Sequence, residues 1–371
     1  MLAVTAVVLV GCASASSGSS PPALSSGSPT PSTRPADSKA ADLRTQLDLL
    51  LEEHVIVVAK QAIAASNNTD EYAGYATLLT TNANALVDVM RSVFGNTSAA
   101  EFERLWVVQN GYLVDYTIGL VTHNADKSNG AMSGLVNGFE PQFTQLMANI
   151  TSLPKDSIAG LETAQVTGAK TVIDDEISQS YSAMYSDLRA AYGDGARTGD
   201  VLATQIAQQF PDKFPGDPTT SAVDARVSLN GLLQEISYLE TMNSDAVIAG
   251  RAAEATAAFG ALAAARGELV RVLGLLFGPE VQAKLAEAWA SRDADLDLYA
   301  KSADAAAHQR LIESFVPHVA ALTPAPAEAV RRQVVATLHV IDDQRSKSYE
   351  QLANDDRAAA TAMQPMADRI D

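Results

Sequence analysis

The amino-acid sequence predicts an all-α protein made of two tandem antiparallel helical-bundle repeats. Alanine and leucine are abundant, aromatic residues make up only 6% of the chain, and runs that alternate β-branched with polar residues are missing, which favours helices over strands. From about residue 40 onward, apolar residues recur at three- and four-residue spacing, as they do in amphipathic helices. Several landmarks of the first half also recur in the same order in the second half.

The N-terminal segment carries the single cysteine of the chain, Cys12, after a short apolar run. This run, Leu2–Val10, is shorter than the roughly 20 residues that a membrane-spanning helix needs, and it has the length of the apolar region of a signal peptide. The residues Leu-Val-Gly-Cys at its end resemble the lipobox of bacterial lipoproteins. The resemblance implies that residues 1–11 are a signal peptide and that Cys12 is lipidated. Because no Lys or Arg precedes the run, we expect the true signal peptide to start further upstream.

Residues 12–39 follow with a composition dominated by Ser, Pro, Gly, Ala and Thr. Such a segment cannot bury enough apolar surface to fold, so we expect a disordered tether. The absence of a second cysteine in the sequence leaves no disulfide framework. Together with the lipobox, the tether predicts a protein anchored by lipid to a bacterial cell membrane, on its extracytoplasmic face.

Helical patterns fill the rest of the chain. The stretch QFPDKFPGDPTTS at Gln209–Ser221 contains three prolines and is the best candidate for a linker between two domains. Turn-forming residues predict helix ends in the first half at 66–72, 94–101, 126–130 and 151–157. We expect the first bundle repeat at 40–210, the linker at 211–221 and the second bundle repeat at 222–371.

The two halves share landmarks at matching spacing. The segment VIDDEISQSY at Val172–Tyr181 is followed much later by VIDDQRSKSY at Val340–Tyr349, and the two are identical at seven of ten positions. The sequence therefore predicts a tandem duplication. Upstream, the residues that recur without a gap are Phe94, Trp106 and Tyr116 in the first half and Phe277, Trp289 and Tyr299 in the second. Each tryptophan lies about one turn into an apolar helical stripe, so we expect both to be buried in the core.

Each VIDD segment carries three polar residues that an unbroken helix would place on one face. We expect them to be structural, with the aspartate held by the serine and tyrosine of its own segment, because buried polar groups need partners. The alternative is a ligand or an acid–base group in a pocket between helices. The residues are Asp174, Ser178 and Tyr181 in the first segment and Asp342, Ser346 and Tyr349 in the second.

A metal-binding or metal-dependent helical bundle is the alternative function, and it would use His54 with Asp115 and Asp174 from facing helices. The carboxylates next to His54, Glu52 and Glu53, cannot share its helix face. No two histidines of the sequence have the i, i+4 spacing of helical metal ligands. We therefore expect no bound metal and no other cofactor.

Catalytic motifs are missing from the sequence, which holds neither a Gly-x-Ser-x-Gly elbow nor a phosphate-binding glycine loop, so we expect no enzyme. Asp293, Asp295 and Asp297 alternate as some calcium ligands do, but without the glycine and terminal glutamate of an EF-hand we expect a solvated helix face.

The formal net charge of −18 makes nucleic acid an unfavourable partner. The expected partners are the membrane, through the lipid anchor, and an unknown protein or small-molecule ligand.

The lipobox, the tether and the repeated EEHV, Leu-Trp, Asp-Tyr-Thr and VIDD landmarks together resemble an uncharacterised group of bacterial secreted and lipid-anchored helical-repeat lipoproteins. The resemblance covers the chain from about Asp42 to the C-terminus. It implies the fold and the location but no established activity. From the sequence as a whole we expect a binding or scaffolding role. The resemblance also implies that relatives carry histidines at the positions of Gln109, Gln165 and Gln333, so that a histidine-rich pocket has been lost here.

Overall fold

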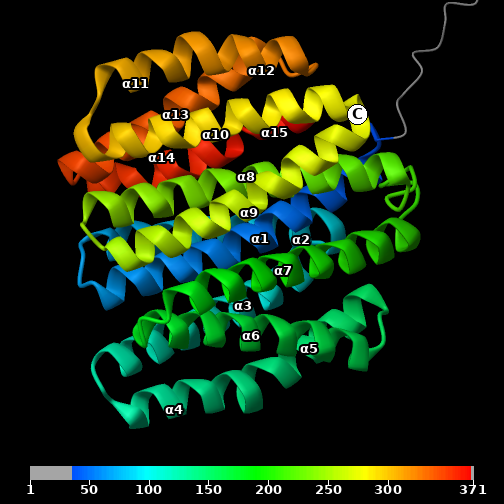
Figure 1. Cartoon of the computed structure of the whole chain (residues 1–371). Coiled ribbons are helices and arrows are strands. Elements are labelled where there is room, and N and C mark those ends of the chain that lie inside the picture. The colour runs from blue at the N-terminus through cyan, green and yellow to red at the C-terminus, as the bar shows by residue number, and fades with distance from the viewer. Residues whose placement is uncertain (1–35, 369–371) are drawn as a thin grey trace, which may run out of the picture. The chain divides into compact units, whose positions relative to one another are not determined.

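The computed structural model of the protein describes residues 36–368, and all regular structure in this part of the chain is helical (Figure 1). The predicted all-α class is confirmed. Cys12, the predicted signal peptide and most of the predicted tether lie outside the described residues. The first half contains α1 (Lys39–Ser66), α2 (Glu71–Phe94), α3 (Asn96–Val121), α4 (Ala125–Ser133), the π-helical segment η1 (Gly134–Phe139), α5 (Glu140–Thr151), α6 (Lys155–Ile177) and α7 (Tyr181–Gln209).

The second half has a similar order of helices. After the Pro-rich residues 210–220, the chain forms α8 (Ser221–Ile248), α9 (Ala252–Phe277), α10 (Pro279–Ser302), α11 (Ala305–Arg310), the π-helical segment η2 (Leu311–Phe315), α12 (Val316–Leu322), α13 (Ala327–Ser346), α14 (Tyr349–Thr361) and α15 (Gln364–Ala367).

One predicted helix end was wrong. Residues 126–130 lie inside α4, and the break comes earlier, at 122–124. His123 has a left-handed backbone there (φ 54°), and the Asn124 side chain accepts a hydrogen bond from the backbone N–H of Lys127. The polar residues that follow therefore form the first turn of a helix, where Asn and Asp are favoured, rather than a loop.

Two sharp corners use glycine at corresponding positions of the predicted repeats. Gly95 alone separates α2 from α3, and Gly278 alone separates α9 from α10. Their φ angles are 83° and 90°, a region in which a side chain would be strained. Each corner leads into the helix that carries one of the two tryptophans. Trp106 and Trp289 are 1% and 2% exposed, which confirms the expectation that both are buried in the core.

Helices α1 and α8 are buried on almost all sides. They lie side by side in the same direction, and further helices pack around them: α2, α6 and α7 around α1, and α9, α10, α13 and α14 around α8 (Figure 1). Helix α1 therefore lacks the solvent-exposed face that the amphipathic spacing from about residue 40 onward led us to expect. Asp48, Glu52 and Glu53 are buried along with the leucines, because packing from opposite sides leaves α1 no solvent face.

The two halves interlock. Helix α7 of the first half packs against α9 of the second, and α14 of the second half packs against α2 of the first. Ala353 of α14 belongs to the core of the first half, while Val55 and Ile56 of α1 belong to the core of the second. Residues 36–368 accordingly lie within one compact unit, and the segment at 210–220 connects two helices of that unit. This differs from the expected pair of domains joined by a linker, because the buried surfaces of the halves face one another.

Ion pairs between the central helices are reciprocal. Nη1 of Arg44 in α1 lies 2.6 Å from Oδ1 of Asp224 in α8, and Nη1 of Arg226 in α8 lies 2.8 Å from Oδ1 of Asp42 in α1. Arg44 occupies the place in the first predicted repeat that Arg226 occupies in the second, and Asp42 corresponds to Asp224 in the same way. Each half therefore provides the partner for the other.

A second reciprocal set involves the last long helix of each half. Nε of Arg189 in α7 lies 2.7 Å from Oε1 of Glu235 in α8, and Nε of Arg357 in α14 lies 3.0 Å from Oε1 of Glu53 in α1. These four residues again correspond pairwise between the predicted repeats. Recurrence of whole ion pairs at matching positions is what a duplicated chain would show.

Candidate functional site

The three residues of the predicted metal site lie in separate surroundings. His54 is buried, its Nε2 lies 2.8 Å from Oδ1 of Asn110, its ring packs on Trp106, and burial lowers its pKa. Asp115 is exposed and pairs with Lys127. Asp174 is bound by other partners, described below. Among residues 36–368, no three His, Cys, Asp or Glu side chains are arranged to hold a metal ion.

Of the three glutamines at the positions implied to be histidine in relatives, Gln109 and Gln333 are buried and Gln165 is half-buried. Nε2 of Gln109 donates to Oε1 of Glu162 at 3.2 Å, and burial raises the pKa of Glu162 to about 8. Gln165 lines a narrow apolar cavity of about 20 Å³, which has room for about one water molecule. In the second half, Oε1 of Gln333 accepts a hydrogen bond from Arg292 at 2.7 Å.

The VIDD segments differ from the expected single face. Helix α6 ends at Ile177 and α13 ends at Ser346, and in each case a residue with left-handed backbone, Gln179 or Lys347, redirects the chain. Tyr181 and Tyr349 therefore begin new helices and do not continue the face that carries the aspartates. The serines instead bond locally, Ser178 to the carbonyl of Asp175 and Ser346 to that of Asp342.

The aspartates find their partners on another helix. The hydroxyl of Tyr116 in α3 lies 2.5 Å from Oδ1 of Asp174, which also pairs with Lys170. In the second half, the hydroxyl of Tyr299 in α10 lies 2.8 Å from Oδ1 of Asp342. The two tyrosines are landmarks that recur between the halves, so this contact accounts for the joint recurrence of tyrosine and aspartate.

The alternating aspartates of α10 do not form the expected solvated face. Asp293 and Asp295 are buried and pair with Arg266 and Arg310 respectively, while Asp297 pairs with Lys301 nearer the surface. The spacing of the aspartates within α10 could not predict these partners, because Arg266 comes from α9 and Arg310 from α11.

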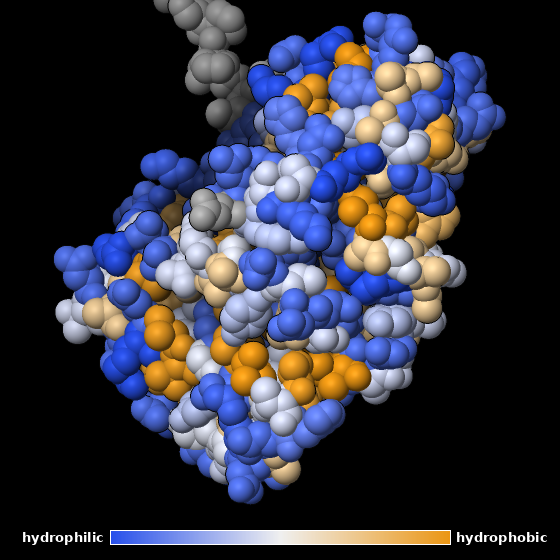
Figure 2. Space-filling model, turned by 90° about the vertical axis from the view of Figure 1, so that its left-hand side faces the viewer, coloured by the Kyte–Doolittle hydropathy of each residue, from blue (hydrophilic) through white to orange (hydrophobic). Residues whose placement is uncertain are grey.

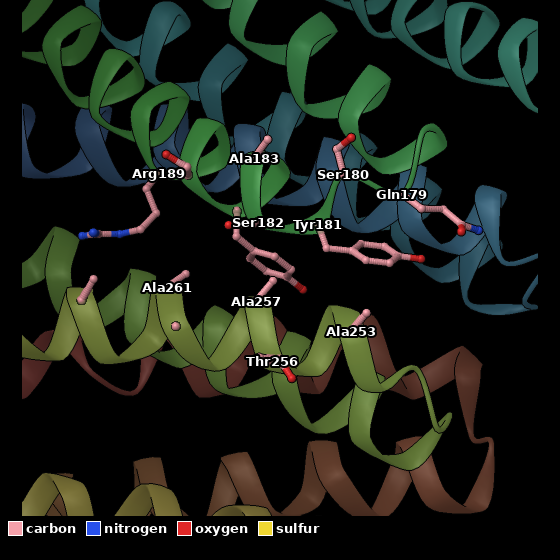
Figure 3. A pocket seen from close by; sticks show the side chains of 14 residues that line it. Gln179, Ser180, Tyr181, Ser182, Ala183, Arg189, Ala253, Thr256, Ala257 and Ala261 are labelled. Carbon is pink, nitrogen blue, oxygen red and sulfur yellow. The ribbon is translucent and has the colours of Figure 1, made fainter.

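An open groove runs between the start of α7 and one face of α9 (Figure 3). Its volume is about 820 Å³. We call it the α7–α9 groove. Tyr181 lies toward one end and Arg189 toward the other, with Ser182 of α7 between them. Ser186 of α7 also lines the groove. The side of α9 that faces them carries only small side chains, namely Ala253, Thr256, Ala257, Gly260, Ala261 and Ala264.

Arg189 is partly committed to protein partners, because it pairs with Glu235 and also lies 3.1 Å from Glu268. The groove therefore offers hydroxyl groups and the rings of Tyr181 and Tyr185 above an apolar floor of small residues, with one partly neutralised cation. This combination of an apolar surface and a few polar groups is typical of ligand sites.

A second groove, of about 640 Å³, lies at the corresponding place between α2 and α14. Lys347, Ser348 and Tyr349 stand where residues 179–181 stand in the α7–α9 groove. Its floor is tighter, because a Cβ added at Gly74 would approach the carbonyl oxygen of Tyr349 to 2.9 Å. Figure 2 looks onto the end of the domain where both grooves begin, and hydrophobic side chains lie among hydrophilic ones there.

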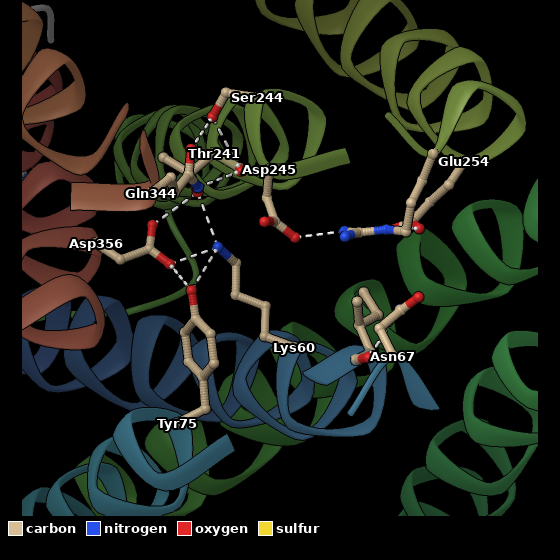
Figure 4. Close-up of polar contacts among 11 residues, drawn as sticks. Lys60, Asn67, Tyr75, Thr241, Ser244, Asp245, Glu254, Gln344 and Asp356 are labelled. Atoms are coloured by element: carbon tan, nitrogen blue, oxygen red, sulfur yellow. Dashed lines mark hydrogen bonds and ion pairs between the residues drawn. The ribbon is translucent and has the colours of Figure 1, made fainter. Parts of the chain in front are cut away.

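A buried polar cluster joins the two halves (Figure 4). Nζ of Lys60 lies 2.5 Å from Oδ2 of Asp356 and 2.9 Å from Oγ1 of Thr241. The hydroxyls of Thr241 and Tyr75 donate to the same carboxylate, at 2.7 and 3.2 Å. These residues come from α1, α2, α8 and α14. We call them the Lys60 cluster, and with Lys60 4% and Asp356 0% exposed it is closed to any solute.

Further ionisable groups lie beside this cluster. Arg251 pairs with Asp245 at 2.5 Å and with Glu254 at 2.6 Å. Burial raises the pKa of Glu71 to about 8, with the nearby Asp245 carboxylate adding to the effect, and burial raises that of Glu176 to about 7. At neutral pH, protonation of such carboxyls removes part of the cost of burying them.

The Lys60 cluster is the main feature that sequence reasoning missed. Lys60 is the one charged residue in the run VIVVAKQAIAA, and a lone lysine in an apolar helix is a signal that it is paired in the core. Asp356 gives no comparable signal, since it follows Asp355 in a polar stretch. Its partner lies almost three hundred residues away in the chain, so only the packing of α14 on α2 reveals the pair.

Within the described residues, no helix combines the length and the apolar character that crossing a bilayer requires. Comparison of the chain with protein-family models, with curated proteins and with solved structures finds no match.

Proposed function

We propose that this protein is a binding module held by a lipid on Cys12 at the outer face of a bacterial membrane, and that the α7–α9 groove takes its ligand. The observation that carries this proposal is the groove itself. Its volume of about 820 Å³ falls within the usual range of ligand sites, and its two walls come from different halves of the chain.

The position of the groove fits a tethered module. Arg44 near the start of α1 pairs with Asp200 in the last part of α7, so α7 ends where α1 begins. With 29 residues, α7 is about 40 Å long, and its first turn lies at the far end of the domain from Ala36. A domain anchored through the residues before Ala36 would present the groove away from the membrane.

The chemistry of the groove favours an elongated ligand with hydroxyl or amide groups. The small side chains of α9 leave a continuous floor along which such a ligand can lie, and hydroxyls of α7 can bond to it from above. We assign binding rather than catalysis because the carboxyl groups whose pKa values burial raises most, such as those of Asp48, Glu52 and Glu71, are enclosed between helices and do not line the groove.

We further infer that the two halves arose by tandem duplication and that the α7–α9 groove and its counterpart between α2 and α14 were once equivalent. The reciprocal ion pairs, the two glycine corners and the two Tyr–Asp contacts support this view. The tighter floor of the second groove would then reflect divergence after duplication.

The anchor is tested by replacing the cysteine. Cys12→Ser should release the protein from the membrane fraction, because the lipid attached to the sulfur is the membrane contact in this proposal. The measurement is immunoblotting of membrane and soluble fractions with and without alkaline wash. Undiminished membrane association of the variant would exclude lipidation of Cys12.

The groove is tested with two tryptophan substitutions on the same helix. Gly260→Trp fills the floor of the α7–α9 groove, whereas Gly267→Trp places the same side chain on α9 outside it, and a Cβ at either position meets no other atom within 4 Å. Native mass spectrometry of protein extracted from its own membranes should show a bound small molecule in the wild type and in Gly267→Trp, but not in Gly260→Trp. Equal retention by both variants would remove the groove from the proposal.

A further inference from the structure

The most exposed large apolar side chain of the described residues, that of Leu275, lies near the end of α9. Leu275 is 77% exposed and the adjacent Leu276 is 42% exposed. Phe277 and the corner at Gly278 follow directly. Two neighbouring leucines held open to water are unfavourable unless something covers them.

The corresponding corner of the first half exposes no large apolar side chain, because the counterpart of Leu275 is the exposed polar residue Ser92. Val93, which corresponds to Leu276, is 6% exposed, and the ring of Phe94 packs on Phe210 at 5.8 Å. Nζ of Lys213 bonds to the carbonyl oxygen of Ser92. The segment after α7 therefore packs at this corner, where Val93 is buried, whereas within residues 36–368 no segment covers Leu276 in the same way.

The open corner lies at the end of the domain that also holds Ala36, the first described residue. Helices α8 and α9 are antiparallel and joined by a short turn, so Leu275 lies about level with Arg226 on α8. Nη1 of Arg226 donates to the carbonyl oxygen of Ala36 at 2.8 Å. Figure 1 shows the start of α1 and the end of α9 at the same end of the bundle.

The length of chain before Ala36 permits contact with a bilayer. Twenty-three residues lie between Cys12 and Ala36, and a chain of that length spans at most about 80 Å. With a formal net charge of −18, the protein gains little from charge attraction to anionic lipids, so a docking contact must be largely apolar. Two leucines beside the exposed Arg271 supply such a contact, with a cation placed near the headgroups.

We propose that Leu275 and Leu276 dock into the interfacial layer of the bilayer that carries the anchor. This rests on the lipidation of Cys12 proposed above. Docking at this corner fixes the orientation of the domain, with the α7–α9 groove pointing away from the membrane. The lipid surface takes the place at Leu276 that Phe210 and its neighbours take near Val93.

The test uses the full lipidated chain in phosphatidylcholine vesicles. Because Cys12 is the only native cysteine and is blocked by lipid, Leu275→Cys can carry an environment-sensitive fluorophore. Leu298→Cys is the matched control, an exposed leucine on α10 toward the opposite end of the bundle. We expect a blue-shifted emission at position 275 and quenching by nitroxide-bearing lipids at least about twofold stronger than at position 298.

Three other outcomes would overturn the proposal. Equal quenching at both positions would mean that the corner does not face the bilayer. A blue shift at position 275 without nitroxide quenching would mean that a second copy of the chain covers it. Wild-type-like quenching at position 275 after Leu276→Ser would show that the leucine pair does not hold the contact. Failure of the protein to enter vesicles at all identifies a failure of the lipid anchor itself, which the Cys12→Ser fractionation detects separately.

Discussion

The protein contains two junctions at corresponding places, one polar and one apolar. In the first, Lys60, Thr241, Asp356 and Tyr75 form the buried cluster between α1, α8, α14 and α2. In the second, the corresponding positions lie on α8, α1, α7 and α9, and all four belong to the apolar core. They are Met242, Ala59, Leu188 and Ala258.

The apolar junction shows that the architecture does not require a buried ion pair. Removing two charges from water costs about as much as their attraction returns, so such a pair contributes little to stability by itself. The buried ion pair instead determines which helices can pack against each other. In a chain with two similar halves, α7 and α14 could exchange places, but Leu188 of α7 would leave the ammonium of Lys60 without a partner. The Lys60 cluster therefore favours one pairing of the halves.

The largest effect on stability is expected when only one partner of the buried ion pair is removed. Lys60→Met should lower the free energy of unfolding by about 3–5 kcal/mol, because it leaves Asp356 charged and fully buried. Lys60→Met combined with Asp356→Leu copies Met242 and Leu188 of the other junction and should recover most of that loss. Urea denaturation of the single and double variants measures both.

A surface ion pair serves as the control for this comparison. Lys127 and Asp115 are both more than a third exposed, so Lys127→Met should cost less than about 1 kcal/mol. If the double variant at Lys60 and Asp356 is no more stable than Lys60→Met alone, the polar junction contributes something that the apolar one does not, and the account given above is wrong.

A medium effect is expected at Glu162, another polar residue of the first half whose counterpart, Val330, is apolar. Burial raises the pKa of Glu162 from 4.5 to about 8. The folded protein keeps this proton while the unfolded chain loses it, so the stabilisation is complete below pH 4.5 and is lost as the pH rises toward 8. Between pH 5 and 7, wild-type stability should fall by roughly 1–3 kcal/mol more than that of Glu162→Gln.

The measurement is guanidinium denaturation at a series of pH values, with Glu287→Gln, an exposed glutamate, as the control. That variant should follow the wild-type curve. Parallel pH curves for Glu162→Gln and the wild type would show that Glu162 ionises in the folded protein as it does in the unfolded chain.

The smallest effect is expected where the two halves are most alike. Tyr116→Phe and Tyr299→Phe each remove one hydrogen bond to a partly solvated aspartate, which should cost about 0.5–1.5 kcal/mol. Similar losses in both variants, read from thermal melts at one pH, would support equivalence of the two contacts. A loss confined to one half would show that the recurrence of tyrosine and aspartate has another cause.

The sequence was sufficient for the helical class, for most helix ends and for the burial of both tryptophans, because periodicity and turn residues act over a few neighbouring positions. It was insufficient for the partners of Asp174 and for the Lys60 cluster. A left-handed residue at Gln179 breaks the continuous face, and Asp356 reaches Lys60 through packing between the halves. Pairings of this kind depend on which helices meet, and no spacing within one helix encodes that.

The contact between Arg226 and Ala36, the first described residue, has a mechanical consequence. This one side chain bonds to the carbonyl of Ala36 and to Asp42, while Arg44 reaches back to Asp224. A pull on the residues before Ala36 is therefore shared at once between α1 and α8, which run in the same direction. Such a load acts as shear along two buried helices and not as the peeling of one from the surface. Tension at the N-terminal end would have to break contacts of both halves together before any helix could be drawn out.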